Sequence, residues 1–266
     1  MAPTLPHAAR NAGLLAVTGL AAVTLAGCDT SVPNQLDFSD TEKVKITEIV
    51  IGSGSGSGDV TVKTAAISDT RIKRVVRYRG VEPARSYRLD GTVLHVDTDC
   101  GDDCSVSYDI VAPTGVAVRG EVTSGDIDLT AVATADVRIS SGNIRVTGAT
   151  GQVRAEASSG GIAVTDVAGP TRLVATSGEI TGRGLGRAPV NAEVSSGDID
   201  LELTTAGPVT AHATSGNVTV RVPDGRYRVR SNVDSGDERV GIQDDPTATV
   251  LLDVDVTSGD LVIARR

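Results

Sequence analysis

The sequence predicts an all-β protein whose body is a β-solenoid, a stack of two-strand coils of 17–20 residues. Three observations favour this fold. A Ser-Gly dipeptide recurs along the chain, and apolar and polar residues alternate on both sides of it. The composition also supplies small aliphatic side chains with very few rings: hydrophobic residues make up 39% of the 266 residues and aromatic residues 2%. A narrow core suits such a composition better than a broad sandwich core, which usually contains larger rings.

The Ser-Gly dipeptide predicts a sharp corner. Glycine reaches positive φ without steric cost, and we expect the serine hydroxyl to satisfy nearby backbone groups. An earlier copy of the motif begins at Ser57 and stands apart from the others. Successive serines of the main series are 17, 18, 18, 19, 19, 20 and 23 residues apart: Ser124, Ser141, Ser159, Ser177, Ser196, Ser215, Ser235 and Ser258.

The residues around each corner alternate with period 2, which indicates strands and not helices. Ile144 and Val146 follow one corner, for example, and Val137 and Ile139 precede it. A looser turn such as residues 148–151 joins one repeat to the next. One repeat cannot bury its inner face, whereas stacked repeats form a continuous core, each coil adding ~4.8 Å. The alternative is an antiparallel meander or barrel of hairpins. The near-constant repeat length and the small inward alanines favour the solenoid.

Residues 44–112 form an irregular β-rich segment that precedes the repeat array at 113–266. Because a solenoid needs its ends covered, we expect this segment to be a cap or the first, wider coils. Asp90-Gly91 is a hairpin signal. The expected strands are 44–51, 60–64, 71–79, 86–89, 93–96 and 106–111.

The N-terminus indicates export. The apolar run from Leu14 to Leu25 is too short to span a bilayer, which takes ~20 residues, but it suits a signal peptide. Leu25-Ala26-Gly27-Cys28 resembles a bacterial lipobox. That resemblance implies a signal peptide at 1–27, lipidation of Cys28 and stable anchoring through acyl chains. We expect residues 28–43 to be a tether. The alternatives are an ordinary secretory signal with an accidental cysteine, or a signal anchor.

The other two cysteines, Cys100 and Cys104, are predicted to form a disulfide, which is the default outside the cytoplasm. A metal site would require two more soft ligands, and the closest histidine in the sequence is His95. A redox-active pair is the remaining alternative.

The charge and composition bear on partners and on the source. The formal net charge is −9, and a nucleic-acid partner would require a concentrated basic face, so we expect no nucleic acid to be bound. Arginine far outnumbers lysine, and alanine, glycine, valine and aspartate are abundant. This usage is typical of a GC-rich genome. We therefore expect a lipid-anchored protein on the outer face of the cell membrane of a high-GC Gram-positive bacterium.

Candidate catalytic residues are scarce. His95 and His212 are predicted to lie on strands without a partner nucleophile, so we expect no enzyme, no catalytic residue and no cofactor site. A polysaccharide-processing β-helix is an alternative, but Tyr227 is the only aromatic residue beyond position 112. Calcium is the other alternative, because oxygen ligands follow many corners. These are Asp59, Asp126, Asn143, Glu179, Asp198, Asn217, Asp237 and Asp260. Asparagine and glycine interrupt the carboxylates, and we expect no metal site.

Three features together resemble a known family. They are the lipobox, the run Cys104-Ser-Val-Ser-Tyr-Asp-Ile-Val-Ala-Pro113 and the Ser-Gly-Asp-[Ile/Val] repeats. They resemble a bacterial β-strand-repeat family of unknown function labelled "putative adhesin", over roughly residues 44–263. The resemblance implies a β-repeat domain displayed at the cell envelope, with an unknown partner there and sometimes a link to envelope stress responses. It supplies no catalytic residues.

Overall fold

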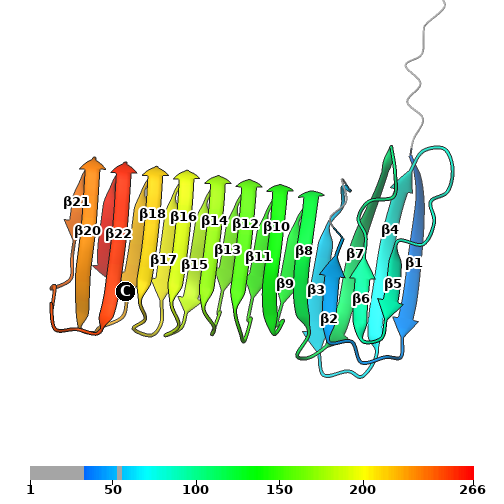
Figure 1. Cartoon of the computed structure of the whole chain (residues 1–266), viewed down its shortest axis with the longest axis horizontal. Helices are drawn as coiled ribbons and strands as arrows, with labels where there is room; N and C mark the ends of the chain where they lie inside the picture. The colour runs from blue at the N-terminus through cyan, green and yellow to red at the C-terminus, as the bar shows by residue number, and fades with distance from the viewer. Residues whose placement is uncertain (1–32, 53–55) are drawn as a thin grey trace, which may run out of the picture. The chain divides into compact units, whose positions relative to one another are not determined.

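The computed structural model describes residues 33–52 and 56–266, and these fold as one unit from Pro33 to Arg266. They form one sheet of 12 strands and one of 11 (Figure 1). Among the described residues no helix is long and apolar enough to cross a membrane. The predicted signal peptide and Cys28 lie outside the described residues.

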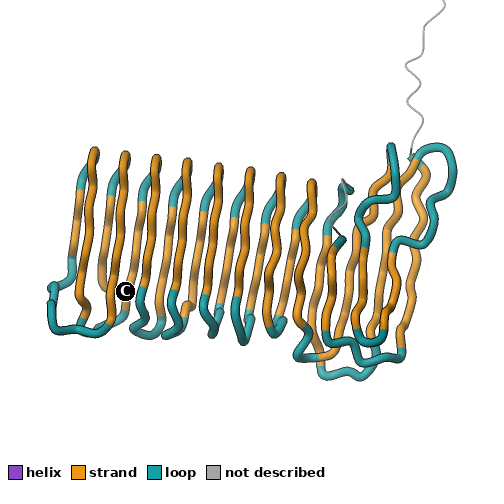
Figure 2. Tube along the Cα trace, viewed as in Figure 1, coloured by secondary structure: helices purple, strands orange, loops and turns teal. Residues whose placement is uncertain are grey.

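Most of the described unit is strand, and turns and loops connect the two sheets (Figure 2). The first sheet runs β1 (Asn34–Glu42), β4 (Thr70–Tyr78), β7 (Cys104–Pro113), β3 (Val60–Ala65), β9 (Ile127–Thr130), β11 (Ile144–Thr147), β13 (Ile162–Thr165), β15 (Ile180–Leu185), β17 (Ile199–Leu203), β19 (Val218–Val222), β23 (Leu261–Arg265) and β21 (Glu238–Val240). The second runs β20 (Tyr227–Ser235), β22 (Val250–Ser258), β18 (Val209–Ser215), β16 (Val190–Ser196), β14 (Thr171–Ser177), β12 (Val153–Ser159), β10 (Thr134–Ser141), β8 (Ala117–Ser124), β2 (Glu48–Ile51), β6 (Val93–Val96) and β5 (Tyr87–Asp90).

The pairing between repeats is parallel and in register, which makes the fold a β-solenoid and excludes the antiparallel meander. Ile144 pairs with Ile127 on one side and Ile162 on the other. Each of these side chains is at most 1% exposed. The same holds along the array, so equivalent inward residues stack into one core between the sheets. The predicted alternation of inward and outward residues is confirmed.

Glycine is required at the corners for two reasons, as Gly160 illustrates. Its φ is +129°, a conformation that favours glycine. A Cβ atom at this position would also lie 1.8 Å from the carbonyl oxygen of Gly142 in the preceding coil. The corner glycines of neighbouring coils therefore pack directly on each other, and no other residue type fits there.

The coils do not stack in sequence order at the C-terminal end. The last coil, β22 and β23, lies between β18/β19 and β20/β21. The physical reason lies in the outermost coil, β20/β21. There Glu238 occupies the inward position that Leu261 occupies in the neighbouring coil. Glu238 is exposed and accepts a hydrogen bond from the Ser231 hydroxyl. A coil with a carboxylate at a core position is stable only as the outermost one.

The N-terminal end is also out of order. The separated copy of the motif forms a coil from β2 and β3, which pairs with β8/β9 of the array and with β6/β7 on its other side. Beyond β6/β7 the pairing becomes antiparallel, through β4 and β1 in one sheet and β5 in the other. Residues 44–112 thus supply both coils and a cap.

The expected tether at 28–43 is wrong in its second half. Asn34–Glu42 forms β1, which pairs over its full length with β4. The sequence gives no clear strand signal here, because β1 is mostly polar. It lies at the edge of the sheet and pairs with β4 alone. Leu36 is only partly buried and Phe38 is exposed, whereas Asp37 and Asp40 give the edge a negative charge. Charged edges discourage pairing with other chains.

Aromatic residues close the N-terminal end. The Arg74 guanidinium lies against the rings of Phe38 and Tyr87, 4.5 and 5.0 Å from their centroids. Arg74 is only 5% exposed, and it donates hydrogen bonds to Ser86 and Asp40 at 3.2 and 3.4 Å. A buried cation of this kind requires such partners, so the cluster seals the end of the core with polar contacts.

Candidate functional site

The corners carry a ladder of side-chain to backbone hydrogen bonds. The Oδ1 atom of Asp126 accepts the N–H of Asn143 at 2.8 Å, and the Oδ1 atom of Asn143 accepts the N–H of Gly161 at 3.1 Å. Similar bonds link Asp198 to Asn217, Asn217 to Asp260 and Asp260 to Asp237, at 2.7, 3.0 and 3.0 Å. The ladder follows the order of the stack, including its out-of-sequence end.

This ladder corrects the role expected of the corner serines. Among the described residues, none of the corner serine hydroxyls hydrogen-bonds to the backbone; the Asp and Asn side chains two positions later do so instead. Burial alone would raise the pKa of Asp126, but hydrogen bonds from Asn143 and Arg145 outweigh it and hold that pKa below its usual value. The corner oxygens that calcium would need are thus partly engaged. Within the described ranges, no group of three His, Cys, Asp or Glu residues could hold a metal ion.

The outward faces of both sheets are covered by ion pairs. On the second sheet, Arg138 contacts Glu156 at 2.6 Å and Arg172 contacts Glu193 at 3.1 Å. Burial of Glu156 would raise its pKa, but the hydrogen bonds from Arg138 and Arg154 lower it below the usual value. The first sheet has similar pairs: Arg145–Asp126, Arg221–Asp200 and Arg266–Glu202.

The two histidines lie in different surroundings. His212 is exposed on the second sheet, where its register partners are Glu193 and Asp255. His95 lies on β6 directly opposite Arg88 on β5. Its environment differs from the sequence-based expectation, because His95 lines a pocket at the N-terminal cap. The other pocket residues come mainly from strands β2, β5 and β6 and from the loops at 83–86 and 97–100.

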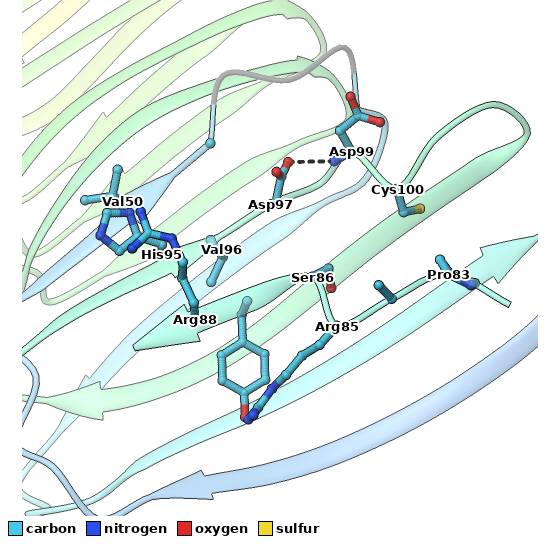
Figure 3. A pocket seen from close by; sticks show the side chains of 13 residues that line it. Val50, Pro83, Arg85, Ser86, Arg88, His95, Val96, Asp97, Asp99 and Cys100 are labelled. Atoms are coloured by element: carbon cyan, nitrogen blue, oxygen red, sulfur yellow. Dashed lines mark hydrogen bonds between the residues drawn. The ribbon is translucent and has the colours of Figure 1, made fainter. Parts of the chain in front are cut away.

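The cap pocket has a volume of about 370 Å³. Its walls are β5, β6 and the loops at 83–86 and 97–100, and Val50 of β2 contributes to its apolar surface (Figure 3). Arg88 and His95 lie together on one side, and Asp97 and Asp99 on another (Figure 3). The volume is within the range of small-molecule sites.

One buried tyrosine holds the two loops of the cap pocket together. The Tyr108 hydroxyl lies 2.6 Å from the carbonyl oxygen of Ser86, 2.7 Å from its Oγ and 2.9 Å from the carbonyl oxygen of Asp97. Burial raises the pKa of Tyr108 to about 12, so this hydroxyl stays protonated. The predicted disulfide between Cys100 and Cys104 is present and closes the second loop. The Tyr108 hydroxyl and the disulfide therefore tie Ser86, Asp97 and Cys100 to β7, the strand that carries Tyr108 and Cys104.

Ser86, His95 and Asp97 all line the cap pocket, but they do not form a catalytic triad. The Ser86 hydroxyl contacts Tyr108 and accepts a hydrogen bond from Arg74. In the described part of the chain, no hydrogen bond joins His95 to Ser86 or to Asp97. A serine nucleophile needs such a base within about 2.6–3.2 Å. The arrangement is suited to binding through hydrogen bonds and charge.

The fold defines a class: a β-solenoid of Ser-Gly-cornered coils whose N-terminal end is closed by the antiparallel strands β1, β4 and β5. The chain belongs to the Toastrack DUF4097 family, whose model matches residues 23–264. This confirms the resemblance to a β-repeat family of unknown function. No curated protein matches the chain.

Solved structures share only a distant likeness. A "putative cell adhesion protein" from Clostridium sporogenes is 11% identical, covers 88% of this chain and 100% of its own, and has a TM-score of 0.31. A "putative adhesin" from Bacteroides fragilis is 11% identical, with coverages of 88% and 99% and a TM-score of 0.31. A "putative adhesin" from Parabacteroides merdae is 10% identical, with coverages of 86% and 96% and a TM-score of 0.39.

Proposed function

We propose that this protein is a lipid-anchored module of the bacterial cell envelope that acts by display and binding, without catalytic turnover. The observation that supports this most is the contrast between constant and variable positions. Corner and inward residues repeat from coil to coil, whereas the outward residues differ: Asp128, Arg145, Ala163, Thr181, Asp200 and Thr219 occupy one row of the first sheet. A constant frame with a variable surface is typical of repeat proteins that bind partners.

The anchoring part of the proposal rests on the lipobox at Leu25–Cys28. Metabolic labelling with an alkyne fatty acid should tag the wild-type protein and leave Cys28→Ser unlabelled. Protease treatment of intact cells should then degrade the labelled protein, as expected for display on the outer face of the membrane. Equal labelling of both forms would contradict the anchor, and protection from protease would contradict the display.

The non-catalytic part has its own test. Full-length protein should release no product from glycan, ester or peptide substrates, and Ser86→Ala and His95→Gln should leave that baseline unchanged. Turnover that both substitutions abolish would assign the cap pocket to an enzyme instead. The calcium alternative predicts a different result, because a ligand at a hundred times its dissociation constant adds ~2.7 kcal/mol of stability. We expect thermal melts with calcium and with chelator to coincide.

A further inference from the structure

The cap pocket presents hydrogen-bond donors on one side. Arg88 and His95 are register partners in the antiparallel pair β5/β6, so their side chains lie next to each other on the same face. Arg88 is exposed, and the nearest carboxylate is that of Asp90, at 3.9 Å, itself exposed. This contrasts with Arg138, which has a close carboxylate partner at 2.6 Å. Arg88 is therefore the pocket cation with most freedom to bind an outside anion.

Asp97 and Asp99 present acceptors on another side of the cap pocket (Figure 3). The Asp97 Oδ1 atom accepts the N–H of Asp99 at 3.0 Å, and the Asp99 Oδ1 atom accepts the N–H of Gly101 at 2.9 Å. These turns fix both carboxylates in place. The Oδ2 atom of Asp97 has no donor among the described residues, and Asp97 is exposed. A ligand with hydroxyl groups would donate to this oxygen.

We propose that the cap pocket binds a short acidic saccharide, with Arg88 and His95 holding its carboxylate and Asp97 accepting hydrogen bonds from its hydroxyls. This inference deepens the proposed function by naming a ligand class, and it rests on that function. The chemistry favours a sugar acid over a phosphate, because a phosphate concentrates up to two negative charges on the one group that would lie near the two aspartates, whereas each carboxylate of a sugar acid carries a single charge. It also favours a sugar over an apolar ligand, because a few precise polar groups surround a small apolar surface.

The contacts that tie the pocket loops to β7 support the same inference. The Tyr108 hydroxyl holds Ser86 and Asp97, and the Cys100–Cys104 disulfide holds Cys100, so both loops are attached to β7 without a ligand. A preorganised site avoids the entropy cost of ordering loops on binding. This matters for a ligand that binds through hydroxyl groups, because each hydroxyl hydrogen bond contributes little binding free energy on its own.

Binding of digalacturonate to the full-length protein, measured by calorimetry, tests the inference. Arg88→Gln and His95→Gln should each weaken binding about tenfold, the loss expected for a charge-assisted hydrogen bond. Arg230→Gln is the matched control, because Arg230 lies on the second sheet at the opposite end of the stack, and it should bind as the wild type does. The dimethyl ester of the disaccharide should bind about as weakly as Arg88→Gln binds the acid.

Three outcomes would overturn the inference: no binding of digalacturonate, equal binding by wild type and both pocket variants, or equally tight binding of inorganic phosphate or glutamate. Thermal melts show whether each variant is folded. If a variant is unfolded, the wild-type protein still tests the role of the ligand carboxylate, because it should bind the dimethyl ester more weakly than the acid. Chromatography of the disaccharide after incubation keeps the two proposals distinguishable. Cleavage would contradict the non-catalytic proposal alone, whereas absence of binding would contradict this inference alone.

Discussion

The middle of the stack and its two ends follow different rules. In the middle, every strand of a coil has the equivalent strand of another coil on both sides, so one set of residues serves all positions: a corner glycine, a branched inward residue and an oxygen for the ladder. At the ends, one neighbour is missing. There the chain uses coils out of sequence order, a carboxylate at Glu238 and a buried Arg74 with aromatic partners. The repeated corner and inward residues specify that the coils stack. Residues that depart from the repeat, such as Glu238, specify where the stack ends.

The largest expected effect comes from exchanging residues between the two regions. Ile144 and Glu238 occupy the same position of their coils, one in the middle and one at the end. Ile144→Glu places an unpaired carboxylate in the core and should cost at least about 4 kcal/mol of unfolding free energy. Glu238→Ile should change it by about 1 kcal/mol or less. Chemical denaturation measures both, and comparable losses would mean that β20/β21 is not the outer coil.

A smaller effect is expected at the corner, where two adjacent glycines differ. Gly160→Ala should cost about 2–4 kcal/mol, because it combines a strained φ with a clash against the backbone of Gly142. Gly161→Ala is the control, since its φ is not in the positive region and its Cβ would lie 3.4 Å from the nearest atom, Asn143 Oδ1. That variant should melt within a few degrees of the wild type. Equal melting temperatures for the two variants would contradict the direct packing of corner glycines.

The smallest effect concerns the ladder. Asp126→Ala removes an acceptor and should cost about 1 kcal/mol, whereas Asp126→Asn keeps an oxygen there and should cost less. The pKa of Asp126 is lowered in the folded state, so its stabilisation is present above pH about 4 and is lost as the pH falls through the folded pKa. Melts between pH 2 and 7 should show a weaker acid dependence for Asp126→Asn than for wild type. Identical pH dependence would show that Asp126 contributes nothing.

The sequence predicted the middle of the molecule well because the same signal recurs there. Alternation identified the inward side of each strand, and the spacing of the serines identified the coils. The sequence analysis missed β1, because this edge strand is mostly polar and lacks the apolar alternation of the inner strands. The cap pocket was also missed. The predicted Asp90-Gly91 hairpin pairs Arg88 with His95, but no sequence signal brings Val50 of β2 or the loops at 83–86 and 97–100 beside that pair. The ladder could have been foreseen from the oxygen-bearing residue two positions after most corner serines.

The central claim, that the last coil lies between β18/β19 and β20/β21, has a direct test by cysteine cross-linking. His212 and Asn232 are both register partners of Asp255. Neighbouring strands lie ~4.8 Å apart, and strands two positions apart lie ~9.6 Å apart, beyond the reach of a disulfide. In a Cys28→Ser background, the pair His212→Cys with Asp255→Cys should oxidise to a disulfide, and His212→Cys with Asn232→Cys should not. The reverse result would show that the coils stack in sequence order and would contradict the account.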